Sequence, residues 1–233
     1  MTSQRARRDI PTERSDFAEK ECLAVARTRA IDFDDKQQLI LDTAADLFAS
    51  RGFASTSINE VAVACGASKS WLYHYHKSKE AILFAILSTH IKEILVRAVE
   101  VFDEADPPET RFRKFLHEIM DIYAEARSKH VVLLNDIGNL PQQQQDEIRA
   151  LERRMVEHLI RLLRDLNPGL LDERQAQKVY AMLFYGMVNW TYTWFDQKGP
   201  LAPGELADRI GDLFLNGFIG LSAANGKPAA SAA

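Results

Sequence analysis

The stretch that decides the fold is SINEVAVACGASKSWLYHYHKSKEAIL, residues 57–83. Ser57 and Glu60 have the spacing of a capping box, and apolar residues at helical spacing follow them. Gly66 favours the end of this short helix, and Ser68 is a good N-cap for the next one. Two short helices joined by a glycine-containing turn predict a helix-turn-helix.

The second of these helices has two different faces when residues 69–76 are placed at about 100° per residue. Leu72, Tyr75 and His76 point inward, and Trp71 lies at the border. The outward face carries Lys69, Ser70, Tyr73 and His74. Such ammonium, hydroxyl, phenol and imidazole groups are poor core material, but they suit the phosphates and base edges of DNA. A solvated helix with a few surface aromatics is the alternative interpretation.

Lysine is the only charged residue type between positions 61 and 79. Ser78 then exposes the N-terminus of the next predicted helix, which is a phosphate-binding position beside Lys79. This local patch matters because the whole chain of 233 residues has a net charge of −4 and offers no general attraction to nucleic acid.

Composition excludes several other classes of protein. Two cysteines without a CxxC motif predict neither a disulfide framework nor a zinc site, and they fit a reducing, cytoplasmic setting. His74 and His76 point away from each other on a helix and therefore cannot share a metal ion. No apolar run is long enough for a membrane span. We expect no metal and no cofactor.

Helical periodicity continues along the chain, without strand-like alternation. We expect an all-α protein in four parts: a mobile charged arm (1–33), a helix-turn-helix domain (34–80), a larger bundle (81–221) and a disordered tail (222–233). Beyond the helix-turn-helix, the predicted helices run from Ser78 to about Phe102, over about 109–127, 129–138, 142–166 and 172–194, and then to about Leu221.

The run from Ile40 to Phe48, then Gly66-Ala67-Ser68-Lys69, Leu72-Tyr73-His74-Tyr75 and Lys79-Glu80-Ala81-Ile82-Leu83, resembles the DNA-binding domain of TetR/AcrR transcriptional repressors. The resemblance covers about residues 36–84 with unbroken spacing. It implies an all-α fold, with an N-terminal three-helix helix-turn-helix domain followed by a larger helical ligand-binding and dimerisation bundle. It also implies a homodimeric repressor that binds a palindromic operator in double-stranded DNA.

By motif position, the resemblance implies DNA contacts at Thr56, Ser57, Ser68, Lys69, Ser70, Trp71, Tyr73, His74 and Lys79. Trp71 is bulkier than the small residue common at its position in the family. His76 stands where the family usually has an inward phenylalanine, and we expect it to be buried with its hydrogen bonds satisfied.

The resemblance further implies release from DNA by a small hydrophobic or amphipathic effector, and acyl-CoA thioesters are one class that fits an apolar pocket. Candidate pocket residues combine apolar surface with a few polar groups. They are His117, Met120, Tyr123, Asn135, Asp136, Phe184 and Trp190. Capping of a helix end is the alternative interpretation of Asn135 and Asp136. The helices at about 172–194 and 203–221 carry more apolar surface than one core uses. We therefore predict that they form the dimer interface, called the dimer seam below.

An enzyme is the rival class, but the chain contains no GxSxG, HExxH, GxGxxG or GxxxxGK[ST] motif. No histidine follows a glutamate at the Glu-x-x-His spacing of helical di-iron enzymes. We therefore expect no enzymatic activity. A helical small-molecule-binding adaptor without DNA affinity remains the alternative.

Overall fold

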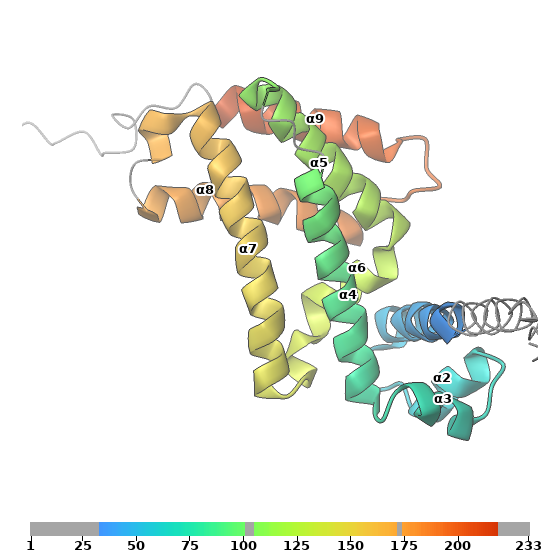
Figure 1. Ribbon diagram of the computed structural model, residues 1–233. Coiled ribbons are helices and arrows are strands. Elements are labelled where there is room, and N and C mark those ends of the chain that lie inside the picture. The colour runs from blue at the N-terminus through green and yellow to red at the C-terminus, as the bar shows by residue number, and fades with distance from the viewer. Residues whose placement is uncertain (1–32, 101–104, 172–173, 219–233) are drawn as a thin grey trace, which may run out of the picture.

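The computed structural model describes residues 33–100, 105–171 and 174–218, and all regular structure in them is helical (Figure 1). This confirms the predicted all-α class. The predicted arm and the predicted tail fall almost entirely outside the described residues. No helix within the described ranges combines the length and the apolar character needed to cross a membrane.

The N-terminal unit consists of a helix over residues 33–51, α2 (Ile58–Ala64) and α3 (Lys69–Tyr75). The Ser57 side chain accepts a hydrogen bond from the backbone of Glu60, and the Glu60 side chain accepts one from the backbone of Ser57. This is the predicted capping box. The turn between α2 and α3 passes through Gly66 at φ 66°, a left-handed conformation that favours glycine.

In the described part of the chain, the larger bundle contains six helices: α4 (Lys79–Glu100), α5 (Pro108–Glu125), α6 (Arg127–Asp136), α7 (Gln142–Leu166), α8 (Arg174–Trp190) and α9 (Pro203–Phe218). Short 3-10 turns lie at Ile137–Asn139, Pro168–Leu171 and Thr191–Thr193. The long helices α4 and α7 pack together, with α2 and α3 near one end of α4 and with α8 and α9 towards the far end of the bundle (Figure 1).

The α-helical part of α8 ends earlier than the predicted 194. After Trp190 the chain tightens into the 3-10 turn, and the Thr191 hydroxyl donates to the backbone oxygen of Val188 at 2.6 Å. Thr193 donates in the same way to Trp190 at 2.7 Å. Threonine side chains that bond to nearby backbone oxygens compete with regular helix, which explains the early end.

Two buried apolar clusters form the core. One lies within the bundle, between α4, α5, α7, α8 and α9. The other lies under the helix-turn-helix, but Val132 and Leu133 of α6 and Ile148 of α7 belong to it as well. Lys129 of α6 also pairs with Asp42 of the first helix at 2.6 Å. The helix-turn-helix is therefore packed on the bundle by apolar contacts and by an ion pair.

Candidate functional site

Helix α3 presents the two faces that its sequence predicts. Leu72 is fully buried, whereas Lys69, Ser70, Tyr73 and His74 are exposed. The Ser68 hydroxyl accepts a hydrogen bond from the backbone N–H of Trp71 at 3.1 Å, which fixes the start of the helix. The half-buried Trp71 ring packs against Tyr75, with centroids 4.9 Å apart. The exposed face is thus a rigid row of cationic, hydroxyl and aromatic groups, which is the chemistry that contacts DNA.

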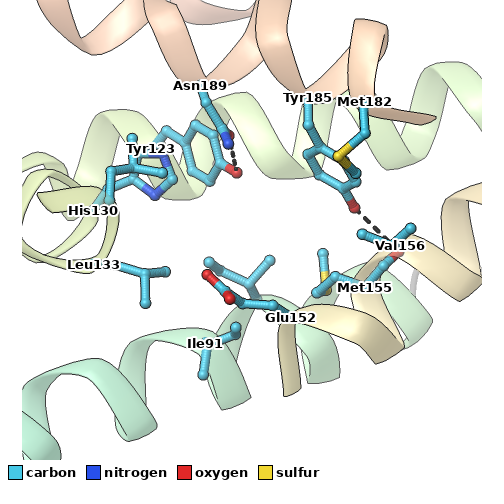
Figure 2. A pocket seen from close by; sticks show the side chains of 12 residues that line it. Ile91, Tyr123, His130, Leu133, Glu152, Met155, Val156, Met182, Tyr185 and Asn189 are labelled. Carbon is cyan, nitrogen blue, oxygen red and sulfur yellow. Dashed lines mark hydrogen bonds between the residues drawn. The ribbon is translucent and has the colours of Figure 1, made fainter. Parts of the chain in front are cut away.

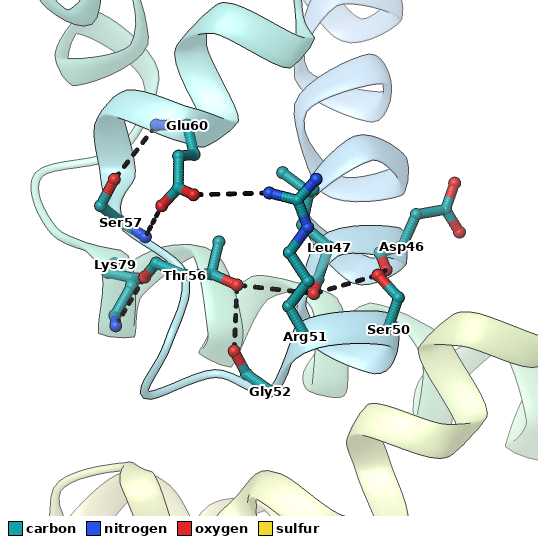
Figure 3. Close-up of polar contacts among 9 residues, drawn as sticks. All are labelled: Asp46, Leu47, Ser50, Arg51, Gly52, Thr56, Ser57, Glu60 and Lys79. Atoms are coloured by element: carbon teal, nitrogen blue, oxygen red, sulfur yellow. Dashed lines mark hydrogen bonds and ion pairs between the residues drawn. The ribbon is translucent and has the colours of Figure 1, made fainter.

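Thr56 and Ser57 hold the turn before α2 (Figure 3). Thr56 is only 1% exposed, and its hydroxyl donates to the backbone oxygen of Gly52 at 2.9 Å. Its side chain is therefore withdrawn from the DNA contact that the family resemblance implies. Ser57 is exposed, but its hydroxyl already serves the capping box.

Lys79 also differs from the expectation. Its ammonium group donates to the backbone oxygens of Phe53 at 2.8 Å and Thr56 at 2.9 Å, and it lies 4.2 Å from the centroid of the Phe53 ring. These contacts direct the charge into the protein instead of towards a phosphate. The structure therefore assigns Lys79 to the loop between the first helix and α2.

We expect Lys79→Met to lower the free energy of unfolding by about 2 kcal/mol, because two charge-assisted hydrogen bonds are lost while the apolar stem is kept. Urea denaturation measures this. Lys77→Met is the control, because Lys77 is exposed two residues away. Equal stability of the two variants would return Lys79 to the role of a phosphate contact.

His76 is buried, as predicted, but it is not satisfied. Its side-chain Nε2 has no hydrogen-bond partner among the described residues. Burial lowers the pKa of His76 and so favours the neutral ring. The imidazole fills the space of an inward aromatic residue and leaves one buried polar atom unpaired.

A cavity of about 260 Å³ lies in the bundle between α4, α5, α6, α7 and α8 (Figure 2). Most of its lining is apolar. The lining residues are Ile91, Ile94, Tyr123, His130, Leu133, Leu134, Glu152, Met155, Val156, Met182, Tyr185 and Asn189. A largely apolar cavity with a few polar groups is typical of a small-molecule site.

The polar groups of the cavity are arranged by contacts between helices. The Tyr123 hydroxyl donates to Asn189 Oδ1 at 3.0 Å, and the Tyr185 hydroxyl donates to the backbone oxygen of Met155 at 3.1 Å. His130 stacks on Tyr123, with ring centroids 3.4 Å apart. Figure 2 shows Glu152 across the cavity from this group.

His130 and Glu152 are two cavity residues whose pKa values are shifted by burial. Burial lowers the pKa of His130 to about 3, so its ring is neutral at physiological pH, and neither ring nitrogen has a hydrogen-bond partner among the described residues. Burial also raises the pKa of the Glu152 carboxyl group. The cavity thus offers an unpaired imidazole for a neutral polar group of a ligand, while a carboxylate faces the same space.

His130 also contacts the ring of His90 on α4, with centroids 5.7 Å apart. Both nitrogens of His90 are likewise unpaired among the described residues, and burial lowers its pKa to about 4. The pair lies where α6 meets α4.

Among the predicted pocket residues, the structure places Tyr123 in this cavity and puts the others elsewhere. Met120 and Phe184 are buried in the bundle core. Trp190 is 65% exposed. His117 Nε2 lies 2.7 Å from Asp208 Oδ1, where it joins α5 to α9 outside the cavity.

Asn135 and Asp136 lie at the end of α6 and do not line the cavity, and Asp136 makes no side-chain cap hydrogen bond to the backbone. Asn135 donates to the backbone oxygen of Val131 at 2.7 Å, and Asp136 accepts from Asn139 at 3.0 Å. Sequence reasoning missed His130, Glu152, Tyr185 and Asn189. No sequence signal marks them, because a polar residue on a half-buried helix face has the same pattern whether it lines a cavity or faces solvent.

Comparison with known proteins gives matches in both parts of the chain. Residues 40–86 match "Bacterial regulatory proteins, tetR family", and residues 105–218 match "Tetracyclin repressor-like, C-terminal domain". The HTH-type transcriptional regulator YuxN of Bacillus subtilis is 35% identical over 107 residues, which is 46% of this chain. That match spans 36% of the length of YuxN, so it covers only part of that relative.

Solved structures match over more of their length. AibR, in complex with isovaleryl coenzyme A and operator DNA, is 28% identical over 76% of this chain and 97% of that chain, with a TM-score of 0.67. A TetR-family transcriptional regulator from Bordetella parapertussis 12822 is 38% identical over 83% of this chain and 98% of that chain, with a TM-score of 0.75. With its helix-turn-helix and its helical bundle both matched, this chain belongs to the TetR family of transcriptional regulators.

Proposed function

We propose that this chain is a transcriptional repressor that binds a palindromic operator in double-stranded DNA as a homodimer and is released by a small effector. The observation that carries the proposal is the exposed face of α3, where Lys69, Ser70, Tyr73 and His74 stand on a helix fixed by a capped glycine turn. Lysine neutralises phosphate, while flat and hydroxyl groups contact base edges and the backbone.

Exposed apolar side chains on α8 and α9 support the homodimer. Leu183 is 56% exposed and Leu213 is 71% exposed, and Val179 is also accessible. A Cβ added at Gly217 would meet nothing within 4 Å among the residues that the structure describes, so a second helix has room to approach there. A second copy that covers this surface would bring two recognition helices together, and DNA binding at cellular salt needs two such modules.

The cavity supports control by a hydrophobic or amphipathic effector. Helix α4 contributes Ile91 and Ile94 to the cavity wall, and its earlier residues Ile82 and Leu83 pack in the core under the helix-turn-helix. A ligand that favours one position of α4 would thereby favour one position of α3, which is the differential binding that coupling requires. Acyl-CoA thioesters are one candidate class, and AibR was solved with a member of this class.

Selection of genomic DNA fragments by the purified protein tests the proposal. We expect an inverted repeat whose half-sites lie about 34–36 Å apart or somewhat more. Lys69→Gln should weaken binding to all sequences and reduce the slope of log affinity against log salt by about one unit.

Lys92→Gln is the matched control, because Lys92 is exposed on α4 and is not part of the recognition helix α3. It should leave both the affinity and the slope unchanged. Failure of the parent protein to select any DNA would reject the repressor and favour the helical adaptor.

A further inference from the structure

A second and larger hollow, of about 1040 Å³, adjoins the cavity between α7 and α8. Glu152, Val156 and Met182 line both spaces, so one opens beside the other. We call this hollow the α7–α8 groove. It is also lined by Arg149, Arg153, Glu157, Ile160, Arg161, Arg164, Arg174, Gln177 and Lys178.

The α7–α8 groove is strongly cationic in a chain whose net charge is −4. Its lining contains five arginines and one lysine against two glutamates. Three arginines elsewhere in the described bundle, Arg97, Arg111 and Arg113, are paired with carboxylates, for example Arg111 with Asp165 at 2.9 Å and Arg113 with Asp212 at 2.8 Å. Within the described ranges no ion pair involves Arg153, Arg164 or Lys178, so these side chains can receive an anion, although the charge of Arg153 also acts on the neighbouring Glu152 carboxyl group and opposes the rise in its pKa.

We infer that the α7–α8 groove binds the phosphate groups of an effector whose apolar end enters the cavity; this inference rests on the proposed function and names its effector class. Arginine presents a planar fork of donors that matches phosphate. Arg153 and Arg164 are eleven residues apart on α7, a span of roughly 16 Å. That span suits several phosphates on one carrier better than a single ion.

The shared residues define what connects the two ends of this effector. Val156 and Met182 offer apolar contact at the junction, which suits a neutral linker. Glu152 opposes an anion there, so a free carboxylic acid is a poor ligand for the cavity. An acyl group joined through a neutral arm to a phosphorylated carrier, as in a coenzyme A thioester, satisfies the apolar cavity, the junction and the cationic groove together.

Isothermal calorimetry with butanoyl-, hexanoyl- and phenylacetyl-coenzyme A tests the inference. The tightest of the three is then compared with the pantetheine thioester of the same acyl group, which lacks the nucleotide and its phosphates. We expect the parent to bind the coenzyme A thioester roughly 30-fold more tightly, because several charge-assisted contacts are present. This preference should shrink as salt is raised.

Arg153→Gln combined with Arg164→Gln should remove most of that preference and leave binding of the pantetheine thioester within about 2-fold of the parent. Both arginines are exposed, so the variant should keep the parental melting temperature. Arg154→Gln is the matched control, because Arg154 is the exposed neighbour of Arg153 and lines neither space. It should bind both ligands as the parent does.

Three results would overturn the inference. They are no binding of any of the three coenzyme A thioesters, equal affinity of the parent for the two kinds of thioester, and equal losses in the Arg154 control and the double variant. Operator binding without ligand is measured on the same proteins. If operator binding is absent while the ligand preference is present, the proposed repressor fails and the phosphate site stands.

Discussion

Replacing Leu213 with aspartate is expected to convert the proposed dimer into a folded monomer and to weaken operator binding by roughly 100-fold or more, although none of the proposed DNA-contacting residues changes. Leu213 is 71% exposed on α9, so the substitution costs the single chain little. In the proposed seam, however, the carboxylate would be buried against apolar surface without a partner, which is strongly unfavourable. One recognition helix alone buries too little surface for tight operator binding.

Sedimentation velocity beside a gel-shift measures both effects. Val96→Asp is the control, because Val96 is an exposed valine on α4 and lies outside the proposed seam. Gly217→Leu should act like Leu213→Asp, since a Cβ added there meets nothing within 4 Å among the described residues and the larger side chain would overpack the proposed seam. A monomeric Leu213→Asp variant with parental operator affinity would show that the seam lies elsewhere.

Lowering the pH from 7 to 5 is expected to reduce the free energy of unfolding by about 4 kcal/mol through His90 and His130. Burial lowers the pKa of His90 to about 4 and that of His130 to about 3, while an unfolded histidine titrates near 6.5. At pH 5 the unfolded chain therefore binds protons that the folded chain does not. Each histidine then costs about 2 kcal/mol, and this stability is fully present above pH 6.5.

Urea denaturation at the two pH values tests this expectation. His90→Leu removes one titrating group from the α4–α6 contact without changing the cavity lining, and it should reduce the pH-dependent loss by about 2 kcal/mol. His74→Gln is the control, since His74 is exposed on α3. An unchanged pH dependence in His90→Leu would mean that His90 takes up its proton over the same pH range in the folded and the unfolded chain.

The helices and the recognition face could be predicted because local sequence determines them. The Ser57 and Glu60 capping box, the glycine at position 66 and the apolar spacing each act within a few residues. The contacts of Lys79 could not be predicted, for the opposite reason. Its partners are the backbone oxygens of Phe53 and Thr56, which lie 26 and 23 residues earlier in the chain.

The cavity was only partly predictable because five helices form it. Tyr123 and Phe184 are both aromatic residues on helices with an apolar face, so the sequence predicts both as pocket residues. In the structure, however, Tyr123 lines the cavity and Phe184 is in the core. What separates them is the way α5 and α8 are rotated against their neighbours. Periodicity shows that a helix has a buried face, but it does not show where packing leaves a gap in that face.

The apolar cluster under the helix-turn-helix has a consequence for chimeric regulators. Six buried residues of that cluster lie beyond residue 86, where the match to the N-terminal family description ends: Leu87, Ile91, Val132, Leu133, Leu140 and Ile148. Joining residues 1–86 to an unrelated effector-binding half would replace these six side chains and leave Leu83, Ile86 and their neighbours against an unmatched surface. A chimera with exchanged DNA specificity therefore has two workable designs. Either only the exposed residues of α3 are transplanted, or the cluster residues of α4, α6 and α7 are transferred together with the DNA-binding half.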